Sequence, residues 1–281
     1  MKFGLSLRNT GPGSSAEAIE AGAETAERLG WEAVWTTDHV LVPESAAGEY
    51  GRTFEVIETL AWVGARHPRL KLGTSVIVVP QRNAVLLAKE LATLDVLSGG
   101  RLIAGVGVGW NETEFANLGV ADRFHRRGAY LDETIRLWRH LWSGSSEPFE
   151  GLFHAFRDFV FGPVPTQGDR LPIVVGGSSP AALRRAGALG DGYHATRATP
   201  DEMARRIPLV RAAADAAGRP GPMFSVRMTA TADFGAMSRD VRAFGELGVE
   251  QLVLVFAETE PAELSAAIER FDREVVRTAS G

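Results

Sequence analysis

Polar and small side chains follow several apolar runs of this 281-residue chain, at the points where predicted strands end. Carboxylate pairs are scarce among them, whereas glycines and small hydroxyl side chains are common. This composition favours the binding of a flat, phosphate-bearing cofactor over hydrolytic or metal chemistry. The positions are Asn9, Thr37, Asp38, His39, Thr74, Ser75, Val76, Gly107, Val108, Gly109, Trp110, Asn111, Glu112, Gly176, Gly177, Ser178, Ser179, His194, Ala195, Thr196 and Arg197.

An acid and an imidazole stand side by side in "WTTDHVLVPES", where the second predicted strand ends. A histidine there can take or give a proton near neutral pH, so His39 is the candidate acid or base. The alternative is a histidine that is only hydrogen-bonded at the rim of the fold.

The segment "VVGGSSPAALRRAG" runs from a strand through two glycines into a helix. Ser179 is predicted to cap that helix, with Pro180 at its first position. Gly176 and Gly177 would let backbone N–H groups approach an anion at the helix N-terminus, together with the hydroxyls of Ser178 and Ser179. We therefore predict a phosphate site here, with Arg197 after the next strand as its cation; a merely well-capped helix is the alternative.

Three glycines, at 105, 107 and 109, occupy one face of the strand in "GGRLIAGVGVGWNETEF". Side chains of a strand alternate between two faces, so this face is emptied along the whole strand end. Glycine inside a strand marks a close approach of a ligand or of another backbone.

Apolar runs rich in Val and Ile alternate with amphipathic helical segments along the whole chain, which is typical of repeated βα units. Eight such pairs predict a (β/α)₈ TIM barrel, as a single domain over residues 1–281. An open dinucleotide-binding sheet fits less well, because the glycine pattern lies in the fourth unit and not the first. The predicted strands cover 2–8, 33–37, 71–79, 101–108, 172–176, 191–195, 224–231 and 251–256. The predicted helices cover 15–29, 53–65, 83–97, 124–142, 179–189, 200–217, 235–247 and 261–276. A β-hairpin insertion is expected at 147–172, before the fifth strand, as a cover, an interface or a substrate lid.

Charge and composition exclude several classes of function. The net charge is -5 and no basic run exceeds two residues, which argues against a nucleic-acid surface. No apolar stretch is long enough for a membrane span, and a strand-like segment directly after Met1 leaves no room for a signal peptide, so a cytoplasmic location is expected. The chain has no cysteine, and its six histidines show no metal-binding spacing; no metal site is predicted.

The block "LGTSVIVVPQRNAVLLAKELATLDVLSGGRLIAGVGVGWNETEF", 72–115, closely resembles the luciferase-like monooxygenase superfamily, in its branch of coenzyme F420-dependent oxidoreductases. "TTDHV" and "PIVVGGSSPAALRRAGALGDGY" extend the resemblance over nearly the whole chain. It implies a barrel that holds a deazaflavin ring at its mouth, with Gly107 and Gly109 clearing space beside the ring. It also implies a cis peptide at Ser75-Val76 that backs the ring, a cofactor contact from Asp38, and a homodimer.

The resemblance implies hydride transfer between F420 and a small organic substrate, with His39 as the proton partner. The alternatives are an FMN-dependent monooxygenase, which would need O₂ and a flavin reductase, and a flavin-binding barrel without catalysis. Asn9 and Trp110 are expected to line the substrate pocket. Trp110 stands where the sugar-phosphate dehydrogenases of the branch have glutamate, so an apolar or aromatic-tolerant pocket is expected.

Overall fold

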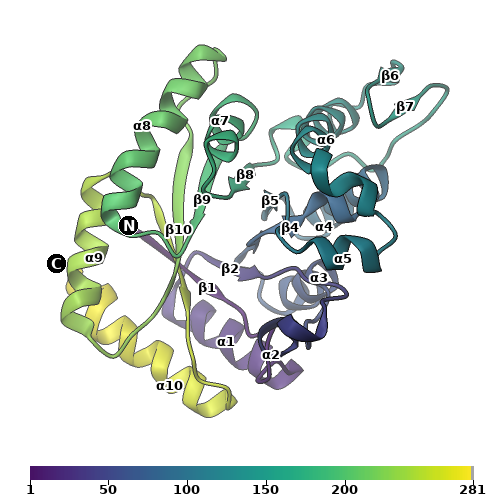
Figure 1. Cartoon of the computed structure of the whole chain (residues 1–281). Helices are drawn as coiled ribbons and strands as arrows, with labels where there is room; N and C mark the ends of the chain where they lie inside the picture. The colour runs from purple at the N-terminus through teal and green to yellow at the C-terminus, as the bar shows by residue number, and fades with distance from the viewer. Residues whose placement is uncertain (280–281) are drawn as a thin grey trace.

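Eight parallel strands pair edge to edge into a closed ring in the computed structural model, which describes residues 1–279 (Figure 1). Pairing of β3 with β5 closes the ring, and the predicted (β/α)₈ barrel is confirmed. In chain order the ring contains β1 (Lys2–Ser6), β2 (Ala33–Thr36), β3 (Lys71–Thr74), β5 (Leu102–Gly107), β8 (Ile173–Gly176), β9 (Gly192–Thr196), β10 (Met223–Thr229) and β11 (Gln251–Val255).

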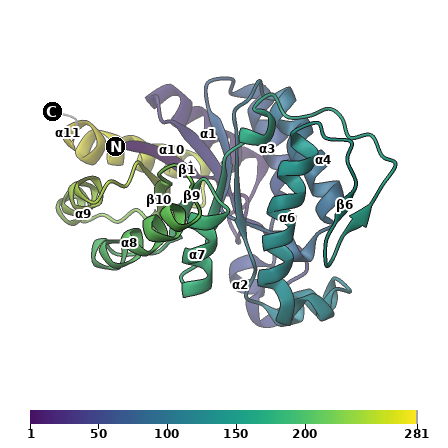
Figure 2. The same cartoon turned by 90° about the horizontal axis from the view of Figure 1, so that it is seen from above.

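Helices cover the outside of the ring, as Figure 2 shows from above. Local capping fixes where they begin and end: Ser15 accepts a hydrogen bond from the Ala18 N–H, and Gly30, at φ 78°, ends the same helix. Ser179 and Pro180 start α7 as predicted. The main helices are α1 (Ala16–Leu29), α3 (Val56–Arg66), α4 (Ala84–Leu97), α6 (Arg127–Trp142), α7 (Pro180–Ala188), α8 (Pro200–Ala216), α9 (Phe234–Glu246) and α10 (Pro261–Phe271), which continues as a π-helical turn (Asp272–Val276). Within residues 1–279 no helix is long and apolar enough to cross a membrane.

The barrel interior is plugged by the indole of Trp35, which stacks on His194 with ring centroids 4.8 Å apart. Gly73 makes this packing possible, because a Cβ at that position would lie 2.4 Å from the indole ring. The plug closes the barrel below its mouth, so a ligand at the C-terminal ends of the strands would rest on a filled core.

The third strand does not run continuously over 71–79. It ends at Thr74, the Ser75-Val76 peptide bond is cis as predicted, and the chain then forms the short β4 (Ile77–Val78) against β5. We call residues 74–78 the bulge. It places Ser75 and Val76 at the barrel mouth.

Gly105, Gly107 and Gly109, in β5 and just after it, face this bulge. This corrects the expectation that they leave open space for a ring. A Cβ at Gly105 would lie 1.7 Å from the Thr74 carbonyl oxygen, and one at Gly107 would lie 2.5 Å from Val76 Cγ2. The backbone of Thr74 and the side chains of Val76 and Val78 therefore fill the face that the glycines empty. Their contribution to a cofactor site is to let the bulge sit close to β5.

The insertion before the fifth barrel strand forms a small antiparallel hairpin, β6 (Phe149–Glu150) and β7 (Ala155–Phe156), beside α6 (Figures 1 and 2). Its tip is anchored by Glu133, whose carboxylate accepts the backbone N–H groups of Phe153 and His154. The predicted hairpin is confirmed. The sequence did not predict two short helices, α2 (Ala47–Tyr50) and α5 (Glu112–Asn117), and both carry residues of the barrel mouth.

Candidate active site

His39 pairs with a buried carboxylate at the mouth of the barrel. Its Nδ1 lies 3.0 Å from Oε2 of Glu114, and the N–H of Val40 donates to Oε1 of the same carboxylate at 2.8 Å. The two side chains are only 7% and 1% exposed. Glu114 comes from α5, which begins where the Asn111 side chain accepts the Glu114 N–H. The pair thus joins the segment after β2 to the short helix α5.

Glu114 is held in its ionised form. Burial alone would raise the pKa of its carboxyl group, but the hydrogen bonds from His39 and Val40 bring that pKa below the ordinary value. An ionised carboxylate only accepts hydrogen bonds, so Nδ1 of His39 must carry a proton. This leaves Nε2 as the nitrogen that can exchange a proton with a substrate.

Two aromatic rings stand beside His39. The Tyr50 ring lies against the imidazole with centroids 4.0 Å apart, and the Trp110 ring meets it edge-on at 6.2 Å. Trp110 is 61% exposed, so one face of this aromatic group is open to solvent. The role of Trp110 in a substrate pocket stays a prediction.

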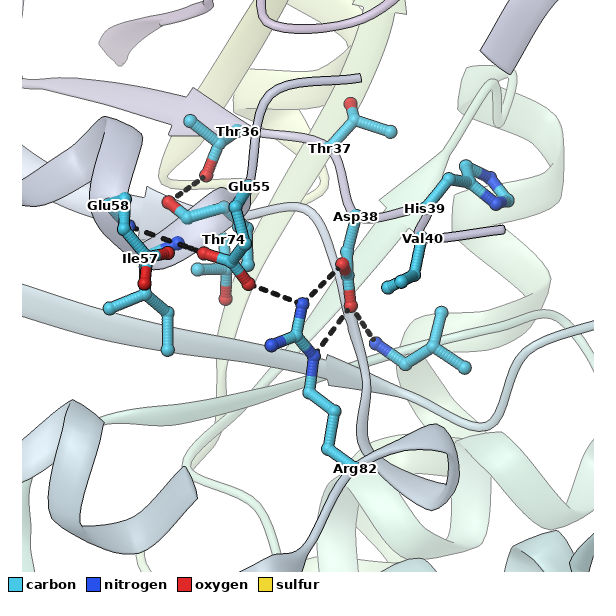
Figure 3. A network of polar contacts seen from close by, with 12 residues as sticks. Thr36, Thr37, Asp38, His39, Val40, Glu55, Ile57, Glu58, Thr74 and Arg82 are labelled. Atoms are coloured by element: carbon cyan, nitrogen blue, oxygen red, sulfur yellow. Dashed lines mark hydrogen bonds and ion pairs between the residues drawn. The ribbon is translucent and has the colours of Figure 1, made fainter. Parts of the chain in front are cut away.

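Asp38 makes a different set of contacts from its neighbour, and Figure 3 shows the two side chains pointing apart. Its carboxylate accepts two hydrogen bonds from Arg82, at 2.7 and 3.3 Å, and one from the Val78 N–H at 2.9 Å. Burial alone would lower the pKa of Arg82, but Asp38 and Glu55 raise it above its ordinary value. These contacts hold the bulge in place. The cofactor contact that the sequence predicts for Asp38 stays a prediction.

Asn9 does not reach the pocket that the sequence predicts for it. It is fully buried, its amide donates to the carbonyls of Thr37 and Phe54, and its oxygen accepts the Thr37 N–H at 3.0 Å. The two bonds to Thr37 brace the chain just before Asp38 and His39, and the third ties Asn9 to the segment before α3. Asn9 is therefore a structural support of the β2 end.

The bulge is also fixed from inside the barrel. Nε2 of His194 lies 2.8 Å from the Ser75 hydroxyl, and Nδ1 lies 2.7 Å from the Ser225 hydroxyl. Burial lowers the pKa of His194 to about 3, with a further contribution from Arg227. The imidazole is neutral at ordinary pH and orients the Ser75 side chain.

The predicted phosphate segment lies at the start of α7. Gly177 adopts φ 113°, a conformation that favours glycine, and Ser178 and Ser179 are exposed. Arg197 is not joined to this segment by any hydrogen bond or ion pair within residues 1–279. It pairs with Glu49 of α2 at 3.1 Å.

Sequence reasoning missed Glu114, Tyr50 and Arg227. A signal for Glu114 was present, because Asn111 followed three residues later by a glutamate is a helix-start pattern. Tyr50 and Arg227 carry no such signal, since the loop that places the first and the strand position that turns the second into the mouth are tertiary features.

Comparison with known proteins gives a family match and several named relatives. A family model described as luciferase-like monooxygenase matches residues 1–245. An F420-dependent glucose-6-phosphate dehydrogenase of Mycolicibacterium fortuitum is 37% identical over 57% of this chain and 50% of its own length. Another, of Kineococcus radiotolerans, is 32% identical over 73% of this chain and 62% of its own length. The chain spans about half to three fifths of the length of these two relatives.

Solved structures share the fold at low sequence identity. An F420-dependent secondary alcohol dehydrogenase, solved with an F420-acetone adduct, matches with a TM-score of 0.83 and 16% identity over 98% of both chains. The monooxygenase RslO1 of Streptomyces bottropensis matches with a TM-score of 0.79 and 23% identity over 99% of both chains. With the family model matching residues 1–245, this chain belongs to the luciferase-like monooxygenase family.

Proposed function

We propose that the chain is an F420-dependent oxidoreductase that transfers a hydride between the deazaflavin and a small organic substrate. The observation that carries the proposal is the pair of His39 and Glu114 beside the bulge at the barrel mouth. Relatives that are 32–37% identical are named for F420-dependent dehydrogenation, which supports the choice of cofactor.

His39 is the proposed catalytic acid or base. When an alcohol is oxidised, its hydroxyl proton passes to Nε2 while the hydride leaves the carbon; when a carbonyl is reduced, Nε2 returns the proton. Glu114 stabilises the positive charge that the imidazole gains and keeps the proton on Nδ1. The bound deazaflavin supplies the carbon that exchanges the hydride.

The residues at the mouth suit a flat cofactor with a phosphate. Val76 of the bulge sits between Gly107 and Gly176, since a Cβ at either glycine would lie within 3.0 Å of its methyl groups. This compact wall, held by His194 and Asp38, would back the ring. The free N–H groups and hydroxyls at the start of α7, from Gly177 to Ser179, would bind the phosphate.

Turnover tests this proposal directly. Purified protein is mixed with reduced F420 and a panel of aldehydes and ketones without oxygen, and loss of the reduced deazaflavin is followed by absorbance. We expect at least one carbonyl compound to be reduced, and the His39→Ala variant to be slow with it. A requirement for reduced FMN, a flavin reductase and O₂ would instead identify a monooxygenase, and cofactor binding without turnover would favour a non-catalytic barrel.

We further propose a homodimer, a single domain and a cytoplasmic location. The insertion exposes apolar side chains, with Val160 99% and Leu152 70% accessible, and a contact with a second copy would cover them. The first and last barrel strands pair along β1 and β11, which supports one domain. Light scattering that gives the 30.2 kDa mass of one chain would refute the dimer.

A further inference from the structure

A cavity opens at the barrel mouth, next to the aromatic rings around His39. It has a volume of about 380 Å³ and lies between the loop after β1, the helix α2 and the ends of β9 and β10. Arg8, Arg197 and Arg227 line it, and the one carboxylate among its lining residues is that of Glu49. Tyr50 belongs to its wall and also packs on the imidazole of His39. Only the Tyr50 ring thus stands between the cavity and the proposed catalytic residue.

The arginines of this cavity have more N–H donors than the hydrogen bonds they make. The Nε atoms of Arg8 and Arg227 are buried without a partner in the described part of the chain. Arg8 donates to the carbonyl of Phe256 and Arg227 to the carbonyl of Ser75, each from one Nη1 atom at 3.3 Å. A guanidinium group has five N–H donors, so most of their capacity is left for another group.

The single carboxylate is already engaged. Glu49 accepts from the Tyr50 hydroxyl at 2.7 Å and from Arg197 at 3.1 Å, and these contacts, against the opposing effect of burial, keep its pKa below the ordinary value. Arg8 and Arg227 therefore have no carboxylate of the cavity as an ion-pair partner. Burial lowers the pKa of Arg227 to about 10, which Tyr50 and Glu49 only partly oppose, and burial likewise lowers the pKa of Arg8.

Buried donors without a partner are costly, and so is buried positive charge that Glu258 near Arg8 and Glu49 near Arg227 offset only in part. A bound anion would satisfy both. We propose that Arg8, Arg197 and Arg227 bind an acid group of the substrate, a carboxylate or a phosphate; this inference rests on the proposed function. Arginine suits such groups because its N–H donors can bond two oxygens at once.

The position of the cavity fits a group on the substrate. Arg227 holds the carbonyl of Ser75, the residue of the bulge that would back the ring, and Tyr50 connects the cavity to His39. The predicted phosphate segment of the cofactor, Gly177 to Ser179, does not line the cavity. The acid group would therefore bind on one side of Tyr50 while the reacting carbon lies near His39.

Inorganic phosphate is the probe for this subsite. It is titrated by calorimetry into the wild-type protein and into the variants Arg227→Met, Arg8→Met and Arg242→Met. Arg242 is an exposed arginine on α9 that does not line the cavity, so its variant controls for the loss of one charge. We expect phosphate to bind the wild type, to bind at least tenfold more weakly to each cavity variant, and to change less than twofold with Arg242→Met. Circular dichroism confirms that each variant is folded, and two separate arginines guard against one that is not.

The affinity for F420 separates the two sources of an anion. The dissociation constant of F420 should stay within threefold of wild type in Arg227→Met and Arg8→Met. An equal loss of F420 and phosphate affinity would assign the arginines to the cofactor and overturn the inference. Absent phosphate binding in the wild type, or equal binding in all variants, would also overturn it. Phosphate titration needs no F420, so a wild type that binds phosphate but not F420 would refute only the proposed function.

Discussion

The substitution Glu114→Gln tests whether this carboxylate sets the protonation of His39. Glutamine keeps one oxygen, which can still accept the Val40 N–H, but it turns an N–H₂ group toward Nδ1 of His39. Nδ1 must then become an acceptor, and the proton of a neutral imidazole moves to Nε2. A misplaced proton on a catalytic histidine, together with the lost negative charge, is expected to lower turnover by ~10²–10⁴-fold. The lost charge-assisted hydrogen bond should also lower the free energy of unfolding by about 1.5–3 kcal/mol.

Nuclear magnetic resonance of protein labelled with ¹⁵N-histidine shows the tautomer without any substrate, and steady-state turnover measures its consequence. Glu112→Gln is the matched control, because Glu112 lies on the same helix with a side chain that is 62% exposed. We expect the control to match wild type in turnover and in the signals of His39, while the signals of His125, whose Nε2 lies 3.6 Å from Glu112 Oε1, change. If Glu114→Gln keeps the wild-type histidine signals and turns over within threefold of wild type, the carboxylate does not orient His39 and the reasoning fails.

Three further predictions address the proton, the phosphate and the barrel core. His39→Ala should leave F420 affinity within a few-fold of wild type while turnover falls by ~10²–10⁴-fold, and wild-type turnover would make His39 structural. Gly177→Asp should weaken F420 binding more than tenfold in a fluorescence titration, whereas Gly218→Asp, at another glycine with positive φ, should not; equal affinities would refute the phosphate assignment. The folded-state pKa of His194, about 3, lies below its ordinary value of 6.5, so the unfolded chain takes up the proton first as the pH falls. The free energy of unfolding should therefore fall by up to about 1.4 kcal/mol per pH unit below pH ~6.5 on account of this group. Urea titrations at several pH values measure this dependence of the free energy of unfolding on pH. The dependence should be weaker in His194→Gln and unchanged in His125→Gln; an unchanged dependence in His194→Gln would contradict the burial argument.

The order of strands and helices was predictable because local sequence patterns, namely apolar runs, helix caps and helix breakers, indicate each βα unit. Ser179 and Pro180 started a helix where their residue types require it. The cis peptide at Ser75-Val76 was predicted from family resemblance and is confirmed, although no local residue preference indicates it. The short helix at Glu112–Asn117 was missed since six residues are too few for a periodic pattern.

Which partner each polar residue takes was the part that the sequence did not determine. Asp38 and His39 are adjacent, yet one turns to Arg82 and the other to Glu114, 75 residues away from His39. The space in front of Gly107 and Gly109 was expected to receive a ring and instead receives Val76 and Val78 of the bulge. Arg197 ends its strand as predicted but pairs with Glu49, away from the start of α7. Each outcome depends on chain segments that meet only in the closed barrel.

The proposed ligand of the barrel mouth is a deazaflavin. Competitive titration of the purified wild-type protein with F420 and FMN, followed by the fluorescence of each, measures this preference. We expect F420 to bind at a single site, FMN not to displace it at equal concentration, and Gly177→Asp to weaken the binding. Tight binding of FMN with no detectable binding of F420 would contradict it.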